Sequence, residues 1–282
     1  MSLVALLLAG AVLGTVIGML GGGGGVLAVP MLVALGEPVL SASTMSLVVV
    51  GTGAAAALVP HQRARRVDWR TGLIFGALGS VGAVVGARVS GLIPDHVLLL
   101  GFSVLVLLGA GTMLRAGRTA RALDGLRAEA GLQDSELLAR HRAVAGVPDP
   151  DVDRAPVASA AVRVDLRVVV LASGVGLVTG LFGVGAGFVV VPALVAALHV
   201  PIKRATATAL VVIVINSLVA LAARHEHLRD LGSALQLAAV TAVFAVIGAV
   251  LSRRVPSWVL SSAFGTLLVL VAVYTIARAL TL

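Results

Sequence analysis

GTVIGMLGGGGGVLAVPMLVAL, residues 14–35, is the most informative segment of this chain, because it interrupts an apolar helical run with five consecutive glycines. A second stretch, GLVTGLFGVGAGFVVVPALVAA at 176–197, repeats it at an offset of 162 residues. The matched positions are Gly14, Gly18, Gly21, Gly23, Gly25 and Pro30 on Gly176, Gly180, Gly183, Gly185, Gly187 and Pro192. The sequence therefore predicts two related halves, each with a helix broken by glycine.

The composition of the chain indicates a membrane protein. Hydrophobic residues make up 59% of the sequence and charged residues only 12%, whereas a soluble domain carries about 25% charged residues. A helix needs about 20 apolar residues to cross a bilayer, and several uncharged runs reach that length, among them 1–36, 38–60, 168–202, 205–223, 231–252 and 255–277. The apolar runs do not alternate as strands of a transmembrane barrel would. We therefore predict an all-α, polytopic transmembrane helical bundle.

Charge and cysteine content exclude several classes of function. The net charge is +8, but most arginines lie in loops beside the apolar runs, as the positive-inside rule expects. This placement argues against a nucleic-acid partner. The chain contains no cysteine, which excludes disulfides, thiolate catalysis and cysteine-ligated clusters. The first residues, MSLVALLLAG, lack a basic leader region, so we expect the first apolar run to stay in the mature protein.

The repeat extends beyond the glycine breaks and predicts three regions. After a one-residue shift, Pro38, Ala42, Leu47 and Val48 align with Pro201, Ala205, Leu210 and Val211; Gly86, Pro94 and Val97 then align with Gly248, Pro256 and Val259 at the original offset. We predict a first membrane repeat at 1–116, a charged cytoplasmic linker at 117–165 and a second membrane repeat at 166–282. The linker combines a helical pattern with the proline-rich segment 147–156.

Loop charges favour inverted repeats. If each glycine break is the tip of a hairpin that enters and leaves on one side, each repeat crosses the membrane an odd number of times. The cytoplasmic side then holds Arg63, Arg65, Arg66, Arg70, the linker arginines, Lys203, Arg204, Arg253 and Arg254, and the outer side holds only Arg88, Arg224, Arg229 and Arg278. This distribution follows the positive-inside rule and places the linker in the cytoplasm and the N-terminus outside.

The glycine breaks have a chemical use as well as a structural cost. Each glycine costs about 1 kcal/mol relative to alanine inside a helix, and an unpaired backbone group in the hydrocarbon region costs several kcal/mol more. The breaks must therefore be buried in protein or line a wet cavity. A half-helix beginning near Gly25 or Gly187 would present unpaired N–H donors and about half a positive charge. Such an end suits an anion.

We therefore predict a substrate-binding site at the two breaks. Its predicted residues are Gly21, Gly22, Gly23, Gly24, Gly25, Gly183, Gly185 and Gly187 in the breaks, the hydroxyls of Ser43, Thr44, Ser46, Thr206 and Thr208, the amide of Asn216, and Lys203. Purely structural interpretations stay open. Glycines at small-xxx-small spacing, such as Gly14 and Gly18, let helices pack closely. The polar side chains can bond helix carbonyls or neighbouring helices, and Lys203 can anchor the topology.

Absent residues narrow the chemistry further. Asp and Glu lie near the ends of the apolar runs and not in their middle, whereas proton relays and cation sites depend on intramembrane carboxylates. No HExxH motif, Walker A loop or cysteine nucleophile occurs. We therefore predict no enzyme, no catalytic residues, no metal site and no cofactor.

The doubled glycine block resembles that of the TauE/SafE sulfite-exporter-type permeases, also called the TSUP family. The pattern G-x-x-x-G-x-x-G-x-G-G-G-x-[LF]-x-V-P-x-L stands at Gly14–Leu32 and, in weaker form, at Gly176–Leu194. The following pattern, Ala42–Leu47 and Ala205–Leu210, belongs to the same resemblance. The resemblance implies a bacterial or archaeal inner-membrane protein that moves sulfite, organosulfonates or related anions.

From these observations we expect a secondary transporter that exports a small sulfur oxyanion or organosulfonate, with alternating access of one repeat against the other. Its partners would be the lipid bilayer and the small anionic substrate, and the sequence is compatible with a homodimer. Two alternatives stay open at this point: an anion-selective channel, and a membrane assembly or sensor protein that uses the basic linker for docking.

Overall fold

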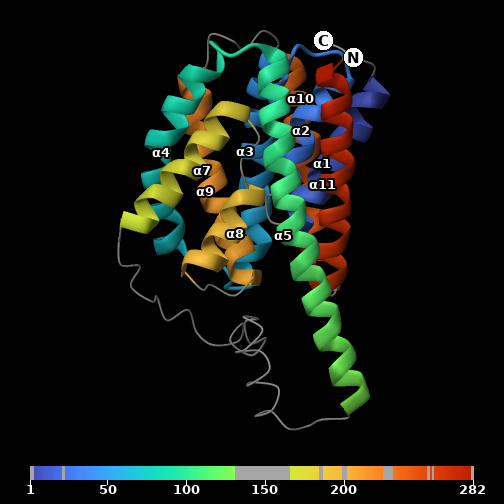
Figure 1. The fold of residues 1–282 in the computed structure, drawn as a ribbon. Helices are drawn as coiled ribbons and strands as arrows, with labels where there is room; N and C mark the ends of the chain where they lie inside the picture. Colours follow the sequence, from blue (N-terminus) through green and yellow to red (C-terminus); the bar gives the residue numbers. More distant parts are fainter. Residues whose placement is uncertain are drawn as a thin grey trace.

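The computed structural model describes residues 3–20, 23–130, 166–183, 187–198, 202–224, 231–252, 255 and 257–280. Its elements are α1 (Leu3–Leu20), the 3₁₀ turn η1 (Gly23–Leu27), α2 (Ala28–Ala34), α3 (Val39–Arg63), α4 (Trp69–Ser90), α5 (Asp95–Ala130), α7 (Leu166–Phe182), α8 (Gly187–Leu198), α9 (Ile202–Ala223), α10 (Leu231–Leu251) and α11 (Ser257–Leu280). These described residues form a bundle of helices without strands (Figure 1). The predicted all-α class is confirmed.

Within the described ranges, four helices are long and apolar enough to cross a membrane: α3, α4 and the greater parts of α9 and α10. Large apolar side chains face outward from them, including Val81 on α4 and Val243 on α10, which are 68% and 61% exposed. Such exposure would be unfavourable in water but suits acyl chains, because lipid tails are as apolar as the side chains themselves. The bundle therefore presents an apolar outer surface to a bilayer.

Helices from the two ends of the chain interleave. Helix α1 packs against α10, α7 packs against α4, and the long helices α3 and α9 pack against each other. Ser43 near the start of α3 bonds to Arg224 just after α9, while Gly51 further along α3 lies against Ser217, which precedes Arg224. Helices α3 and α9 are therefore antiparallel. This is the relation that inverted halves would give, although the repeat relationship itself stays a prediction.

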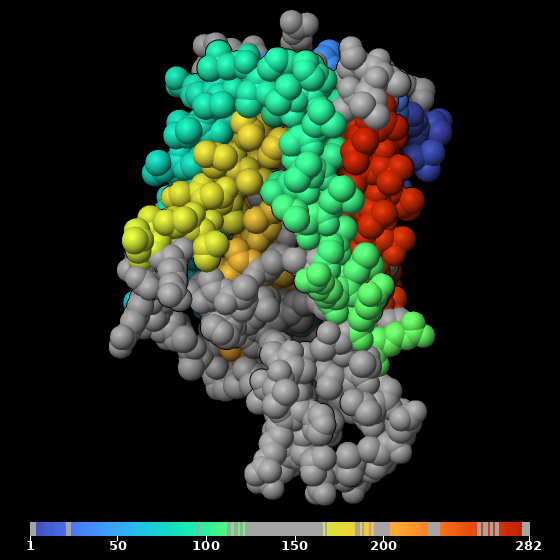
Figure 2. Space-filling view, viewed as in Figure 1, coloured from blue at the N-terminus to red at the C-terminus, as the bar shows by residue number. Residues whose placement is uncertain are grey.

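Helices α5 and α11 lie side by side (Figure 2), and their contacts show that they run antiparallel. The hydroxyls of Ser103 and Thr275 lie 2.6 Å apart, and Gly265, earlier in α11, lies against Leu114, later in α5. Helix α5 extends beyond the bundle to Ala130 (Figure 1). It thus continues past the predicted boundary at residue 117, and the remainder of the predicted linker, 131–165, lies outside the described residues.

Glycines bring the backbones of the interleaved helices into contact. A Cβ atom on Gly180 of α7 would overlap the carbonyl of Ala83 on α4, and one on Gly18 of α1 would overlap the carbonyl of Ala245 on α10. Small residues permit this close approach, which favours association of helices in lipid. The structure thus supports the packing interpretation for the glycines that precede each break.

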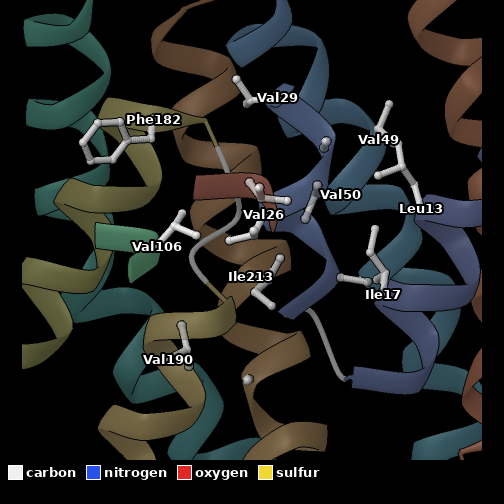
Figure 3. Close-up of a cluster of buried hydrophobic side chains, with 14 of the residues drawn as sticks. Leu13, Ile17, Val26, Val29, Val49, Val50, Val106, Phe182, Val190 and Ile213 are labelled. Atoms are coloured by element: carbon white, nitrogen blue, oxygen red, sulfur yellow. The ribbon is translucent and has the colours of Figure 1, made fainter. Parts of the chain in front are cut away.

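Both predicted breaks interrupt a helix, and the break residues whose burial is described are enclosed by protein. After α1, Gly23–Leu27 form a 3₁₀ turn, and after α7, Gly183 leaves the helix with a φ of +67°. The break residue Val26 is fully buried, among side chains of both halves that include Ile17, Val190 and Ile213 (Figure 3). Irregular backbone is tolerated at membrane depth only in such surroundings. Helix α2 has seven residues and spans about 10 Å, too little to complete a crossing.

Candidate functional site at the second helix break

The second break lies directly against the start of α3. The Ser46 hydroxyl shares its one proton between the carbonyl of Ser43, at 2.9 Å, and the carbonyl of Gly183. The Gly183 N–H donates to the carbonyl of Thr179 at 2.9 Å. Only glycine fits at position 183, because its φ is positive and a Cβ would overlap Ser43. Ser43, Ser46 and Gly183, three predicted site residues, therefore meet at one place.

A buried arginine completes this cluster. Arg224, in the turn after α9, is 2% exposed. Its Nη1 donates to the Ser43 hydroxyl at 2.7 Å, its Nη2 donates to the carbonyls of Gly180 and Leu181 at the end of α7, and its Nε donates to the carbonyl of Ala87 on α4 at 3.4 Å. One guanidinium thus joins α9 to α3, α4 and α7.

The positive charge of Arg224 is not balanced by a carboxylate among the described residues. No Asp or Glu is among the buried polar residues there, and the acceptors of Arg224 are carbonyls and one hydroxyl. Carbonyls at a helix C-terminus stabilise a cation by at most about 2 kcal/mol, whereas removing an ion from water costs several kcal/mol. Among the described residues, which stop at Arg224 and resume at 231, the second break therefore carries a buried positive charge.

Arg224 is not among the site residues predicted from the sequence, which instead places it with the arginines expected on the outer side of the membrane. One signal in the repeat could have found it. The one-residue shift that aligns Ala42 with Ala205 also aligns His61 with Arg224, so both halves carry a basic residue near the end of the long helix. Both are buried, at 5% and 2% exposure. A basic residue that recurs at one repeat position is a stronger sign of a role than a lone loop arginine.

Two predicted hydroxyls have structural partners away from the break. The Thr44 hydroxyl donates to the Leu40 carbonyl of its own helix at 2.9 Å. The Thr208 hydroxyl accepts the backbone N–H of Asp68 at 3.1 Å and so ties α9 to the loop before α4. These contacts favour the structural interpretation for both side chains, and neither hydroxyl joins the cluster around Gly183.

The first break is packed differently from the second. Gly24 lies against the backbone of Val16 and Ile17, so the 3₁₀ turn folds back onto α1. Helix α8, which follows the second break, packs against this turn, and Gly25 and Gly187 are buried.

The remaining predicted site residues are placed as follows. Gly23 lies in the turn, and Thr206 is half-buried on α9. Gly21, Gly22, Gly185 and the side chain of Lys203 lie outside the described residues.

Asn216 is a buried amide on α9. It is 1% exposed, and neither its Oδ1 nor its Nδ2 is paired among the described residues. The amide lies against Gly79 of α4 rather than against a break. An unpaired buried amide destabilises a protein by about 1–3 kcal/mol, so this side chain is unfavourable for stability alone.

We expect Asn216→Leu to leave stability unchanged or raise it by about 1 kcal/mol, because a shape-matched apolar group removes the unpaired amide. If the amide contacts the substrate, transport falls in the same variant. Thermal unfolding in detergent and flux in proteoliposomes measure the two effects. Thr208→Val is the matched control, since it removes a polar group that has a partner and should lower stability. A destabilised Asn216→Leu with unchanged flux would contradict this expectation.

Comparison with known proteins agrees with the resemblance of the glycine blocks. Residues 6–275 match the family model described as "Sulfite exporter TauE/SafE". A "Probable membrane transporter protein" of Xylella fastidiosa strain 9a5c is 29% identical over 98% of this chain and 96% of its own length. The "Probable membrane transporter protein YunE" of Bacillus subtilis strain 168 is 30% identical over 77% of this chain and 76% of its own length. No solved structure matches. This chain belongs to the TauE/SafE sulfite exporter family and is a membrane transporter.

Proposed function

We propose that the protein is a secondary transporter of the bacterial inner membrane that exports a small anion of the sulfite or organosulfonate class. The observation that carries this proposal is the sign of the buried charge. Within the described residues, the charged side chain in the core is an arginine, Arg224, and it lies at a helix break. Buried charges are normally paired with an opposite charge, and a buried cation therefore favours an anionic substrate.

The surroundings of the break support an oxyanion in particular. Ser43 and Ser46 are fully buried hydroxyls within the same cluster. Hydroxyl and guanidinium donors bind the oxygens of sulfite or a sulfonate by charge-assisted hydrogen bonds. The interleaved pairs α1–α10 and α4–α7 give the two halves long contact surfaces. Movement of one half against the other along these surfaces would provide alternating access.

Exchange in proteoliposomes tests this function. Purified protein is reconstituted and uptake is measured with sulfite, thiosulfate, sulfoacetate and sulfate, with empty liposomes as the control. We expect saturable uptake of at least one of these anions, accelerated when the same anion is present on the opposite side. Uptake without acceleration by the opposite-side anion would indicate a channel instead of a carrier. Absence of anion flux with correctly folded protein would overturn the proposed function.

A further inference from the structure

We propose that Arg224 and Ser43 bind the transported anion directly, through the Nη1 of the arginine and the hydroxyl of the serine. This Arg224–Ser43 pair deepens the proposed function and rests on it. The ligand class is a small oxyanion with two or more exposed oxygens, and a doubly charged anion is preferred to a singly charged one. The proposal depends on the charge of Arg224, on the hydrogen-bond donors that remain at Arg224 and Ser43, and on the position of Gly183 beside them.

Arg224 carries a positive charge that no carboxylate of the described residues balances. The guanidinium is removed from water, and its acceptors among the described residues are neutral. Arginine stays charged in proteins, so the site cannot lower its energy by losing a proton. A buried charge is strongly destabilising when no opposite charge accompanies it. A bound anion would supply that opposite charge.

Arg224 and Ser43 together offer two hydrogen-bond donors to a ligand. A guanidinium has five N–H groups, and the hydrogen bonds of Arg224 use Nε, both N–H groups of Nη2, and one of Nη1. Within the described part of the chain, the other Nη1 N–H is left over. Ser43 Oγ accepts from Nη1 at 2.7 Å, so the serine proton points elsewhere. Two donors therefore lie side by side, and two oxygens of one anion can accept from both.

Gly183 lies directly beside the Arg224–Ser43 pair. Gly183 lies so close to Ser43 that a Cβ there would overlap both the carbonyl and the hydroxyl of the serine. The Ser46 hydroxyl holds the Gly183 carbonyl in this position. Both members of the pair are buried, so an anion reaches them only after a movement, and displacement of Gly183 away from α3 would uncover Ser43. Binding and movement of the broken helix are coupled in this way, as transport requires.

Substitution of Arg224 tests the proposal through the KM for sulfite exchange in proteoliposomes. Arg224→Gln keeps N–H donors for the carbonyls but removes the charge, and we expect KM to rise at least about tenfold. Arg224→Lys keeps the charge and should retain more affinity. The ratio of sulfite to chloride affinity should fall in Arg224→Gln. Arg88→Gln is the matched control, because Arg88 follows the Ala87 acceptor on α4 and is exposed; its KM should not change.

A purely structural clamp gives different results. In that case Arg224→Gln would lower the melting temperature and Vmax while KM and the sulfite-to-chloride ratio stay at their original values, and this outcome overturns the proposal. If Arg224→Gln does not fold, Ser43→Ala is measured instead. A raised KM for sulfite in this variant supports the proposal, and an unchanged KM overturns it. If the wild type exchanges sulfite and the variants keep its KM, the Arg224–Ser43 pair is overturned but the proposed function is not. Absence of exchange and of sulfite-dependent thermal stabilisation in the wild type overturns the proposed function as well.

Discussion

Substitution of Gly183 by alanine is expected to destabilise the protein by about 2–4 kcal/mol and to abolish most of its transport. Residue 183 has a φ of +67°, where an alanine is strained by about 1–2 kcal/mol. Its Cβ would also overlap the carbonyl and hydroxyl of Ser43, and overpacking of this kind costs about 1–3 kcal/mol. The overlap would push the break away from α3 and disrupt the Ser46 contact. Thermal unfolding in detergent and anion flux measure the two effects.

Gly36→Ala separates backbone strain from overlap in this experiment. Gly36 also has a positive φ, +94°, but a Cβ there meets no atom of the described part of the chain within 4 Å. We expect Gly36→Ala to be destabilised only by backbone strain, by about 1–2 kcal/mol, and to keep its transport activity. Equal stability of the two variants would show that Gly183 does not lie against Ser43 as the structure places it.

Substitution of Gly176 by leucine is expected to destabilise the protein by about 3 kcal/mol or more. A Cβ on Gly176 would overlap the carbonyl of Gly79 on α4, so a leucine must push the backbones of α7 and α4 apart. Overpacking by a single group costs about 1–3 kcal/mol, and α4 also packs against α9, so the displacement disturbs a second interface. Thermal unfolding in detergent measures this loss.

Gly174→Leu is the matched control for Gly176→Leu. The residue lies on the same helix and is exposed, and a Cβ added there would meet no atom of the described residues within 4 Å. A leucine there would face acyl chains and should change stability by less than about 1 kcal/mol. If both leucine variants unfold at the same temperature, the close contact between α7 and α4 does not contribute to stability.

The helices and their breaks could be predicted from the sequence because both are local properties. Uncharged apolar runs require helices in a bilayer, and five consecutive glycines cannot continue one. The structure confirms a break at Gly23–Leu27 and another at Gly183. The packing of Gly18 and Gly180 against other helices also follows from small-xxx-small spacing. The repeat boundaries and the cytoplasmic linker stay predictions.

The partners of each polar side chain could not be predicted in the same way. In a soluble helix the polar face marks solvent, but in a membrane helix the lipid side and the protein side are both apolar. Sequence periodicity therefore does not say which way Thr44 or Thr208 points. Thr44 bonds its own helix, and Thr208 bonds the loop before α4, although both belong to the site predicted from the sequence.

The class of the protein could be predicted from its residues: an all-helical membrane transporter with two glycine breaks, whose apolar runs lack carboxylates in their middle. The position of the buried charge, in contrast, depends on the packing of the helices. Arg224 follows α9, Ser43 belongs to α3, and Gly180 and Leu181 end α7. These residues are distant in sequence and meet because α3 and α9 run antiparallel beside the break. Composition and spacing report local preferences, whereas this meeting depends on how the interleaved helices pack.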